Sequence, residues 1–338
     1  MRRSFRKRAR RIQRDEAFIL DVVTILFTLP ILLRYLSAEL FLSLEWFSGN
    51  QVVRAGIGIV LVILAIIDFK RGLKRAGAFA LIPVIVIIVE LFWYVPLSAN
   101  HMALSQEQSI RVMTLNTATE PLGNLANDIA ADNIDVACLQ EVYDLEVDEF
   151  LDRMKTLGYA GYYATLRDDA GMGTVLLSRL PVVRIDTITT SSWKERERRF
   201  LAAQINAYGQ TVRVITVQLE STNRKQQLYG VIESWRLRLQ QSRLLADAVR
   251  GSYHPLVIAG DLNSTPTNRS LKPLREVLKD SWQVAGAGLG GTWPVALPAL
   301  RIDAILYRGF ENAANTRVFR TAHSDHRAYR VDLLLPAK

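Results

Sequence analysis

One cysteine, Cys138, is present among the 338 residues, and its isolation excludes a disulfide framework within the chain. The fold therefore does not depend on oxidation, although this does not identify a compartment. Because Cys138 lies in an apolar run of strand length, we expect a buried small hydrophobe rather than a nucleophile. Internal repeats are absent too, and a hydrophobic fraction of 49% excludes intrinsic disorder for most of the chain.

A surplus of positive charge is missing from the C-terminal two-thirds of the chain. The net charge is +9, but residues 1–100 carry 14 Lys and Arg against 7 Asp and Glu, and residues 101–338 carry 28 against 26. The isoelectric point near 9.7 therefore reflects the N-terminal segment. Since DNA-binding domains usually present a basic surface, nucleic acid is a partner that the sequence allows but does not favour.

Three apolar runs within the first hundred residues predict a membrane region. They follow a basic arm of residues 1–16 and span Phe18–Leu33, Ala55–Ile67 and Ala76–Val89, the last continuing to Ala99. A spanning helix needs about 20 mostly apolar residues, and the first two runs reach this only with polar flanks. We expect a region of three transmembrane helices over residues 17–99, with two or four spans as alternatives. The alternatives, a cleaved signal peptide or a basic nucleic-acid arm, would explain the basic arm and the first apolar run but not the second and third runs.

The charges of the loops predict an orientation. The N-terminal arm and the loop Lys70–Arg75 are basic, whereas the loop between the first two runs carries Glu39 and Glu45. Positively charged loops remain on the cytoplasmic side. We therefore expect a multi-pass plasma (inner) membrane protein with a cytoplasmic N-terminus, the lipid bilayer as partner and an extracytoplasmic second domain. Changing the number of spans by one would reverse that side.

After a polar linker at residues 100–109, the domain of residues 110–338 alternates short strands and helices. Two stretches have helical spacing, Leu122–Ala131 and Lys225–Arg250. The expected strands are Ile110–Leu115, Val136–Leu139, Thr174–Leu177, Ala202–Ile205, Val212–Val217, Leu256–Ala259, Ile302–Tyr307 and Arg330–Leu334. This order favours mixed sheets in a two-layered sandwich flanked by helices.

Polar clusters at five strand ends are the candidate site. They contain four carboxylates, two amides and one imidazole: Asn116, Glu141, Asp261 with Asn263, Asp303, and Asp325 with His326. Converging carboxylates repel one another, and a hard divalent cation such as Mg²⁺ offsets that repulsion. His326 adds a group that can donate to a phosphoryl oxygen or move a proton. Each cluster alone is also explained by a turn, a cap or a surface pair, but together they fit metal-assisted phosphoryl hydrolysis.

The order of these segments resembles that of the endonuclease/exonuclease/phosphatase superfamily, with its deoxyribonuclease-I-like fold. The matching stretches, within about residues 110–336, are RVMTLNTA, DVACLQEV, GMGTVLLSRLPV, FLAAQI with VRVITVQLE, LVIAGDLNSTP, GTWP, RIDAILY and SDHRAYRVDL. The combination of LQE, GDLN and SDH is specific, although each alone is not. The resemblance implies a four-layered α/β sandwich of two packed mixed sheets.

The resemblance also implies roles for the candidate residues. Glu141 would bind Mg²⁺, or Mn²⁺ as a substitute, with Asn116 beside it and Asp325 touching the metal. Asp261 would orient or deprotonate the attacking water, and Asn263 would hold a phosphate oxygen. Asp303 would position the water, the metal or His326. Asp325 would orient His326, which would contact the scissile phosphate.

One position departs from the family pattern. Many members carry a His where this chain has Gln218, and a glutamine can bind a phosphate oxygen but cannot carry a proton at neutral pH. Gln218 therefore argues against a two-histidine mechanism and against true deoxyribonuclease activity. The nearby motif WKERERR, with Arg198, is expected to be a solvated charged loop, with a phosphate-facing role as the alternative.

The sequence therefore predicts a membrane-anchored, Mg²⁺-dependent phosphoesterase. Its substrate would be a phosphodiester or a phosphomonoester, of a lipid head group or a small molecule. The alternatives are an extracytoplasmic metal-dependent nuclease and a non-catalytic scaffold or binding module that retains the fold. No obligate protein partner is evident, and substrate identity and oligomeric state stay open.

Overall fold

The computed structural model describes residues 12, 15, 18–19, 21–26, 51–72, 74–102, 109–166, 171–192, 196–222, 227–321 and 324–337. The chain divides into two compact units, Met1–Tyr94 and Val95–Lys338.

Two helices form the described core of the first unit. They are α3 (Gln51–Lys70, 20 residues) and α4 (Lys74–Tyr94, 21 residues). Ile57 and Leu61 of α3 pack with Val84 and Ile87 of α4. Half of the first predicted span, Phe18–Leu33, lies outside the described residues.

The predicted membrane localisation is wrong for this structure. Among the residues it describes, no helix is both long and apolar enough to cross a bilayer. The apolar runs Ala55–Ile67 and Ala76–Val89 are bounded by charged residues. At 1.5 Å per residue, each covers only about 20 Å, short of the roughly 30 Å hydrocarbon core. The prediction had counted polar flanks toward the length of the first two runs and had continued the third run past Glu90.

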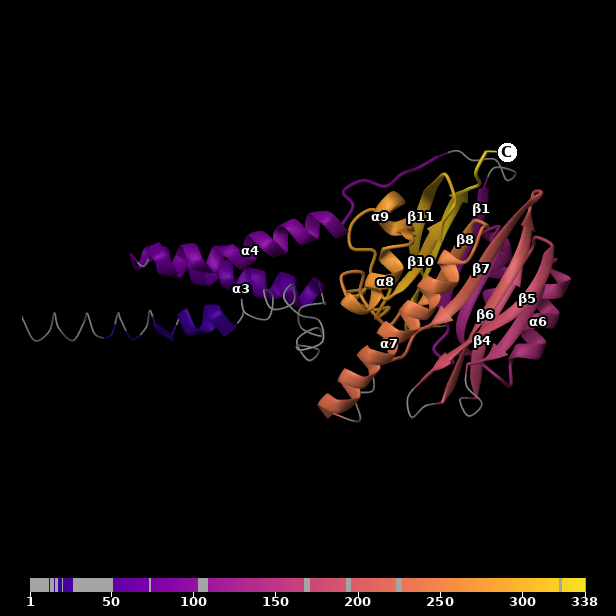
Figure 1. The fold of residues 1–338 in the computed structure, drawn as a ribbon, viewed down its shortest axis with the longest axis horizontal. Helices are drawn as coiled ribbons and strands as arrows, with labels where there is room; N and C mark the ends of the chain where they lie inside the picture. The colour runs from indigo at the N-terminus through magenta and orange to yellow at the C-terminus, as the bar shows by residue number, and fades with distance from the viewer. Residues whose placement is uncertain are drawn as a thin grey trace, which may run out of the picture. The chain divides into compact units, whose positions relative to one another are not determined.

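Two six-stranded mixed sheets form the second unit (Figure 1). The first has the order β11-β12-β1-β2-β4-β3 and the second the order β5-β6-β7-β8-β10-β9. The strands are β1 (Ser109–Asn116), β2 (Val136–Tyr143), β3 (Ala160–Thr165), β4 (Met172–Ser178), β5 (Val182–Ser191), β6 (Glu197–Ala207), β7 (Gln210–Gln218), β8 (Leu256–Asp261), β9 (Lys279–Asp280), β10 (Asp303–Arg308), β11 (Asn312–Arg320) and β12 (Arg327–Leu334).

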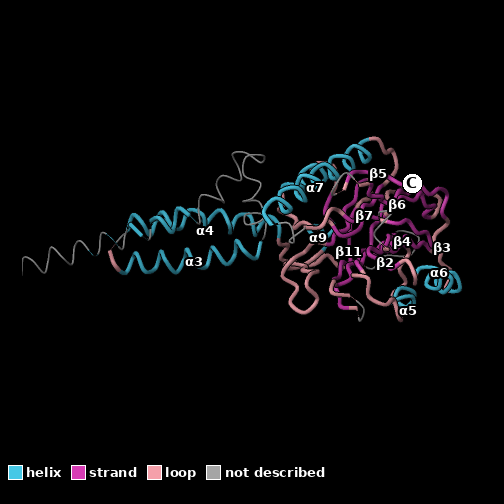
Figure 2. The backbone as a smooth tube through the Cα atoms, turned by 90° about the horizontal axis from the view of Figure 1, so that it is seen from below, coloured by secondary structure: helices cyan, strands magenta, loops and turns pink. Residues whose placement is uncertain are grey.

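Helices cover the outer face of each sheet, which completes four layers. Figure 2 shows α7 on one side of the strands and α5 and α6 on the other. The helices of this unit are α5 (Leu125–Ala131), α6 (Val147–Thr156), α7 (Gln227–Arg250), the 3₁₀ helix η4 (Arg269–Leu271), α8 (Lys272–Arg275) and α9 (Ser281–Ala285). The predicted sandwich of two packed mixed sheets with flanking helices agrees with this architecture.

Alternating apolar residues explain why the strands pack on both faces. In β1, Ile110 and Val112 lie in the core between the sheets, whereas Met113 and Leu115 lie in the core under α5 and α6. Successive side chains of a strand point to opposite faces, so a near-continuous apolar run fits a strand covered on both sides. Cys138 is buried in the inter-sheet core, and burial raises the pKa of its thiol to about 12, which confirms a structural residue.

Candidate active site

Three strand ends of the second sheet bring polar side chains into register. β7 runs parallel to β8 and pairs Gln218 with Asp261. β10 runs antiparallel to β8 and pairs Asp303 with the same Asp261. The end of β7, the end of β8 and the start of β10 therefore meet at one edge. Three residues from distant parts of the sequence become neighbours there.

Gly260 allows β8 to lie against β7 immediately before Asp261. Its φ is +155°, and a Cβ at this position would overlap the backbone carbonyl oxygen of Val217. Only glycine tolerates both the backbone angle and the close approach. This requirement explains the glycine in the GDLN motif.

The first sheet contributes Asn116 and Glu141 at the corresponding edge. Asn116 ends β1 and pairs with Gln140 of the parallel strand β2. A bulge in β2 between Leu139 and Val142 contains Glu141, whose φ is +55°. Thr117 holds this unusual peptide, because its Oγ1 donates to the Glu141 carbonyl oxygen at 2.8 Å. The bulge turns the Glu141 side chain toward Asn116.

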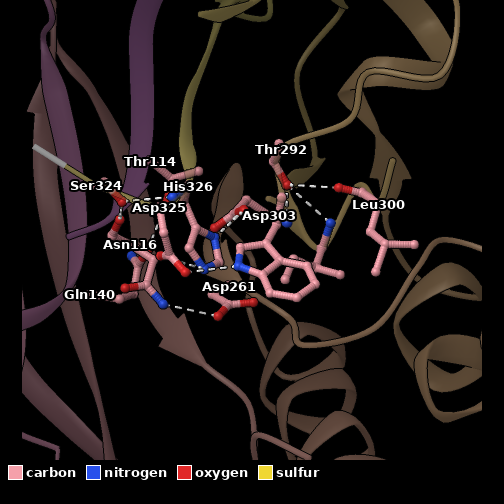
Figure 3. A network of polar contacts seen from close by, with 12 residues as sticks. Thr114, Asn116, Gln140, Asp261, Thr292, Leu300, Asp303, Ser324, Asp325 and His326 are labelled. Carbon is pink, nitrogen blue, oxygen red and sulfur yellow. Dashed lines mark hydrogen bonds and ion pairs between the residues drawn. The ribbon is translucent and has the colours of Figure 1, made fainter. Parts of the chain in front are cut away.

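An amide of Asn116 joins the two sheets (Figure 3). Its Nδ2 donates to Glu141 Oε1 at 3.0 Å and to Asp261 Oδ2 at 3.1 Å. Gln218 Nε2 also donates to Glu141 Oε1. Both carboxylates therefore lie within one hydrogen-bonded group, which is mostly buried.

Asn263 restrains the second of these carboxylates. Its backbone N–H donates to Asp261 Oδ1 at 2.8 Å, and its Nδ2 donates to Asp261 Oδ2 at 3.1 Å. The same Nδ2 donates to the Leu219 carbonyl oxygen at 3.0 Å. Both amide hydrogens are thus used in this conformation. The predicted phosphate contact of Asn263 would require one of these bonds to open.

His326 and Asp303 form a buried pair. His326 Nδ1 lies 2.8 Å from Asp303 Oδ2, and the two side chains are 7% and 0% exposed. Burial by itself lowers the pKa of His326, but the charge and hydrogen bond of Asp303 outweigh it and raise that pKa to about 10. The Asp303 carboxylate thus favours the protonated imidazole. Thr292 Oγ1 accepts the Asp303 backbone N–H at 3.2 Å and holds the start of β10.

Asp325 occupies a different environment from the other acids. Its side chain is 57% exposed, and Oδ1 lies 3.7 Å from His326 Nε2. Oδ2 accepts the indole N–H of Trp293 at 2.9 Å. Ser324 Oγ donates to the Asn116 carbonyl oxygen at 2.5 Å and accepts the His326 backbone N–H at 2.8 Å. Ser324 thus ties the SDH segment to β1.

The acidic cluster makes a protonated Asp261 favourable at acidic pH. Burial and the charge of Asp303 raise the pKa of Asp261 to about 7, although His326 and the backbone N–H of Asn263 oppose this shift. A group with such a pKa changes charge near the operating pH of most enzymes, which is the range that suits proton transfer.

The side chains of this edge fit a hard divalent cation. One carboxylate oxygen of Asp261, one of Asp303 and a ring nitrogen of His326 all lie within 4.8 Å of one another. Because a protonated imidazole cannot bind a metal, the carboxylate oxygens are the candidate ligands of this cluster. Within the described part of the chain, Asp303 Oδ1 and Gln218 Oε1 are buried and have no hydrogen-bond partner. Carboxylate and amide oxygens with unused lone pairs are the donors that Mg²⁺ prefers. The buried acidic cluster agrees with this preference.

The structure brings all eight sequence-predicted residues together in two polar groups that Ser324 connects. The first group contains Asn116, Glu141, Gln218, Asp261 and Asn263. The second contains Asp303, His326 and Asp325, with Trp293 beside Asp325. The predictions did not include Thr117, Thr292 or Ser324, which hold the two groups through their hydroxyls. The available signal was their place in the sequence: Thr117 follows Asn116, Thr292 belongs to GTWP, and Ser324 belongs to SDH.

Solved structures of several proteins share this fold at less than 25% identity, which shows the fold alone. An endonuclease/exonuclease/phosphatase from Beutenbergia cavernae is 23% identical with a TM-score of 0.56, covering 68% of this chain and 72% of that chain. One from Bacteroides vulgatus is 18% identical with a TM-score of 0.57, covering 68% and 99%. A humanized D. rerio TDP2 is 20% identical with a TM-score of 0.53, covering 67% and 98%. A search of curated proteins found no match.

A sequence profile supplies the family. The profile described as "Endonuclease/Exonuclease/phosphatase family" matches residues 113–326, well over half of the chain. This range begins within β1 and ends at His326, so it contains every residue of the two groups described above. The chain therefore belongs to the endonuclease/exonuclease/phosphatase family, whose members are hydrolases that act on phosphoesters.

Proposed function

We propose that this protein is a Mg²⁺- or Mn²⁺-dependent phosphoesterase that hydrolyses a phosphodiester or a phosphomonoester. The observation that carries the proposal is the buried His326–Asp303 pair beside the Asp261 and Glu141 carboxylates, at one edge of both sheets. A cation, a general base candidate and metal-binding oxygens lie together there, which is the set that phosphoryl hydrolysis needs.

His326 supplies positive charge to the substrate. Asp303 holds Nδ1, so Nε2 faces outward toward Asp325 as a donor. In our proposal, Nε2–H donates to a non-bridging oxygen of the scissile phosphate and stabilises the charge that develops there. Asp325 would orient the outer edge of the ring.

Asp261 is the proposed general base. Its carboxylate is fixed by three donors, from Asn263 and Asn116. A fixed carboxylate with a pKa of about 7 can orient a water molecule and accept its proton during attack on phosphorus. When substrate binds, the Gln218 Nε2–H would donate to a phosphate oxygen and would give up its hydrogen bond to Glu141.

Glu141 and Asn116, with Asp325 at the margin, are the residues that we expect to hold the metal. When bound, the ion would act as a Lewis acid that polarises the phosphoryl group and offsets the charges of the clustered carboxylates. The net charge of only +2 over residues 101–338 favours a small phosphoester over a long nucleic acid.

The experiment uses the full chain with an aryl phosphodiester, an aryl phosphomonoester and plasmid DNA, each with Mg²⁺, Mn²⁺ or EDTA. We expect metal-dependent turnover that falls by about 100-fold or more in His326→Asn and Asp261→Asn. Two exposed residues that are not part of the site, His254 and Asp128, provide matched controls as His254→Asn and Asp128→Asn.

The same assay separates the alternatives. A nuclease would lose affinity steeply as salt rises, because phosphate contacts release counterions, whereas a small substrate is less sensitive. Turnover that survives both site substitutions would show that the site is assigned wrongly. If no substrate is turned over and neither metal changes the thermal stability of the protein, the hypothesis of a non-catalytic module is favoured.

A further inference from the structure

A buried charged group lies behind the end of β7, on the side away from Asp261. It consists of Arg198 from β6, Glu220 after β7 and Arg238 from α7, which are 3%, 4% and 5% exposed. Arg198 belongs to the WKERERR motif, which the sequence suggested to be a solvated loop. That expectation is wrong for Arg198, because β6 continues through it and places its side chain inside the domain.

Arg198 makes contact with a carboxylate and with the backbone at once. Its Nη2 lies 3.1 Å from Glu220 Oε2, and its Nη1 donates to the Gln218 carbonyl oxygen at 2.9 Å. Nη1 also lies 3.5 Å from the Leu219 carbonyl oxygen. The planar guanidinium thus bridges Glu220 and the strand end, which a single ammonium cannot do with the same geometry.

Further contacts hold Glu220 in place. Its Oε2 accepts the hydroxyl of Ser192 at 2.7 Å, and its backbone carbonyl accepts Arg238 Nη1 at 2.9 Å. Its backbone N–H donates to Gln241 Oε1 at 2.9 Å. Glu220 is therefore fixed by the residue that follows β5, by β6 and by α7 together.

The backbone that Arg198 holds is the part of β7 that reaches the site. The Leu219 carbonyl oxygen accepts Asn263 Nδ2, and Asn263 in turn holds Asp261. Gln218 Nε2 donates to Glu141. A displacement of this strand end would therefore move groups on both sheets.

The energetic cost of the group argues for a role beyond stability. Burying ions is expensive, and a well-packed apolar replacement of a buried ion pair is often neutral or stabilising. Here two arginines and one glutamate are buried at a distance from solvent, and Arg238 also experiences the attraction of the Asp261 carboxylate. Such a group can instead fix the position of the end of β7 and of the site residues that depend on it.

We propose that Arg198, held by Glu220, is a positioning residue of the hydrolytic site. It fixes the end of β7 so that Gln218 and Asn263 keep Glu141 and Asp261 in place. This inference rests on the proposed function and assigns a role to a residue that contacts neither substrate nor metal.

The test compares Arg198→Lys with the matched control Arg199→Lys in the full chain. Arg199 is the next residue of β6, and its ion pair is with the exposed Glu197. Lysine keeps the charge at position 198 but loses the bridge. We expect kcat on the aryl phosphoester to fall about tenfold or more, with KM changed less than about threefold, because small displacements of catalytic groups are costly. Arg199→Lys should leave both constants unchanged.

A second readout does not depend on turnover. Hydrogen exchange should accelerate in Arg198→Lys over residues 212–221 and 259–265, but not over β1 or β12. Glu220→Gln should reproduce the effect, and the double variant should be no worse than either single one.

The outcomes distinguish the two proposals. The positioning role would be overturned if the wild type is active and Arg198→Lys has the same kcat and KM. It would also be overturned if Arg198→Lys loses exchange protection throughout the domain and not only at the end of β7. Wild type without metal-dependent turnover would overturn the proposed function, and local exchange would then decide alone whether Arg198 holds this strand end.

Discussion

Single residues set the charge of the site, and His326 does so through its partner. The Asp303 carboxylate at 2.8 Å outweighs the cost of burying an imidazolium and raises the pKa of His326 to about 10. An imidazolium that its partner stabilises in this way can donate to a phosphoryl oxygen and offset its negative charge.

Replacing Asp303 should release His326 from this state. In Asp303→Asn, we expect the pKa of His326 to fall by about two units or more, because the neutral amide removes the charge that opposes burial. Titration of the imidazole C–H resonances by NMR measures this directly, since the chain has 4 His. The spectrum of His326→Asn assigns the resonance, and Asp128→Asn should not move it. An unchanged titration in Asp303→Asn would refute the coupling.

Thr117 is a residue-scale prediction about the metal. Its hydroxyl holds the carbonyl of Glu141 in the left-handed conformation. Thr117→Val removes the hydroxyl at nearly constant volume, so we expect Mn²⁺ affinity measured by calorimetry to fall about tenfold, as for other groups that orient a ligand. Thr117→Ser keeps the hydroxyl and should retain most of the affinity. Equal affinities in both variants would exclude this role.

At the scale of elements, apolar runs predicted the central strands well and the edge strands poorly. β1, β7, β8 and β12 cover their predicted ranges, and β10 begins one residue after the predicted start at Ile302. The agreement is good because both faces of these strands are buried and the apolar runs are nearly continuous. β5 and β11 lie at sheet edges with mixed burial, and their polar residues hide the alternation. The prediction also missed helix α6, half of whose residues are charged.

The contact between β7 and β8 at Gly260 gives a prediction for an element. A methyl group there would overlap the Val217 carbonyl oxygen and strain the backbone. We expect Gly260→Ala to lower the free energy of unfolding by at least about 3 kcal/mol, measured by urea denaturation. Gly251→Ala, whose nearest atoms would lie at 3.7 and 3.9 Å, is the control and should cost less than about 0.5 kcal/mol. Similar stabilities would mean that β7 and β8 can separate freely here.

For the whole molecule, the acidic cluster links stability to pH and to metal. The pKa of Asp261 in the folded chain is about 7, above the ordinary carboxyl value of 3.8. The folded state therefore binds this proton more tightly than the unfolded state, and stability falls as pH rises from about 4 to about 7. His326 acts in the same direction at higher pH, since its stabilising contribution is present below about 6.5 and lost through about 10.

Metal should reverse that loss. In EDTA, we expect the full chain to be less stable at pH 8 than at pH 5, by a few kcal/mol of which Asp261 contributes roughly half or more. Mg²⁺ or Mn²⁺ should raise the free energy of unfolding more at pH 8 than at pH 5, because it binds only the folded site. Asp261→Asn should flatten the metal-free pH dependence. Equal stabilisation by metal at both pH values in wild type would contradict this linkage.

Some features of this protein follow from local sequence. Apolar runs specify strands through their burial on both faces, and glycine, asparagine and aspartate at GDLN specify a turn, because these are properties of neighbouring residues. The order of LQE, GDLN and SDH was sufficient to identify the family, and the candidate residues were found at strand ends.

Other features depend on residues that are distant in sequence. The pairing of Asp303 with His326, the bridge of Asn116 between Glu141 and Asp261, and the burial of Arg198 beside Glu220 all arise from packing two sheets and a helix. The exposure of a side chain and its charged neighbours are set by the folded chain. The charge of WKERERR therefore predicted a solvated loop, although the Arg198 side chain is buried. Membrane crossing likewise depended on the apolar length of folded helices, which the runs with their flanks overstated.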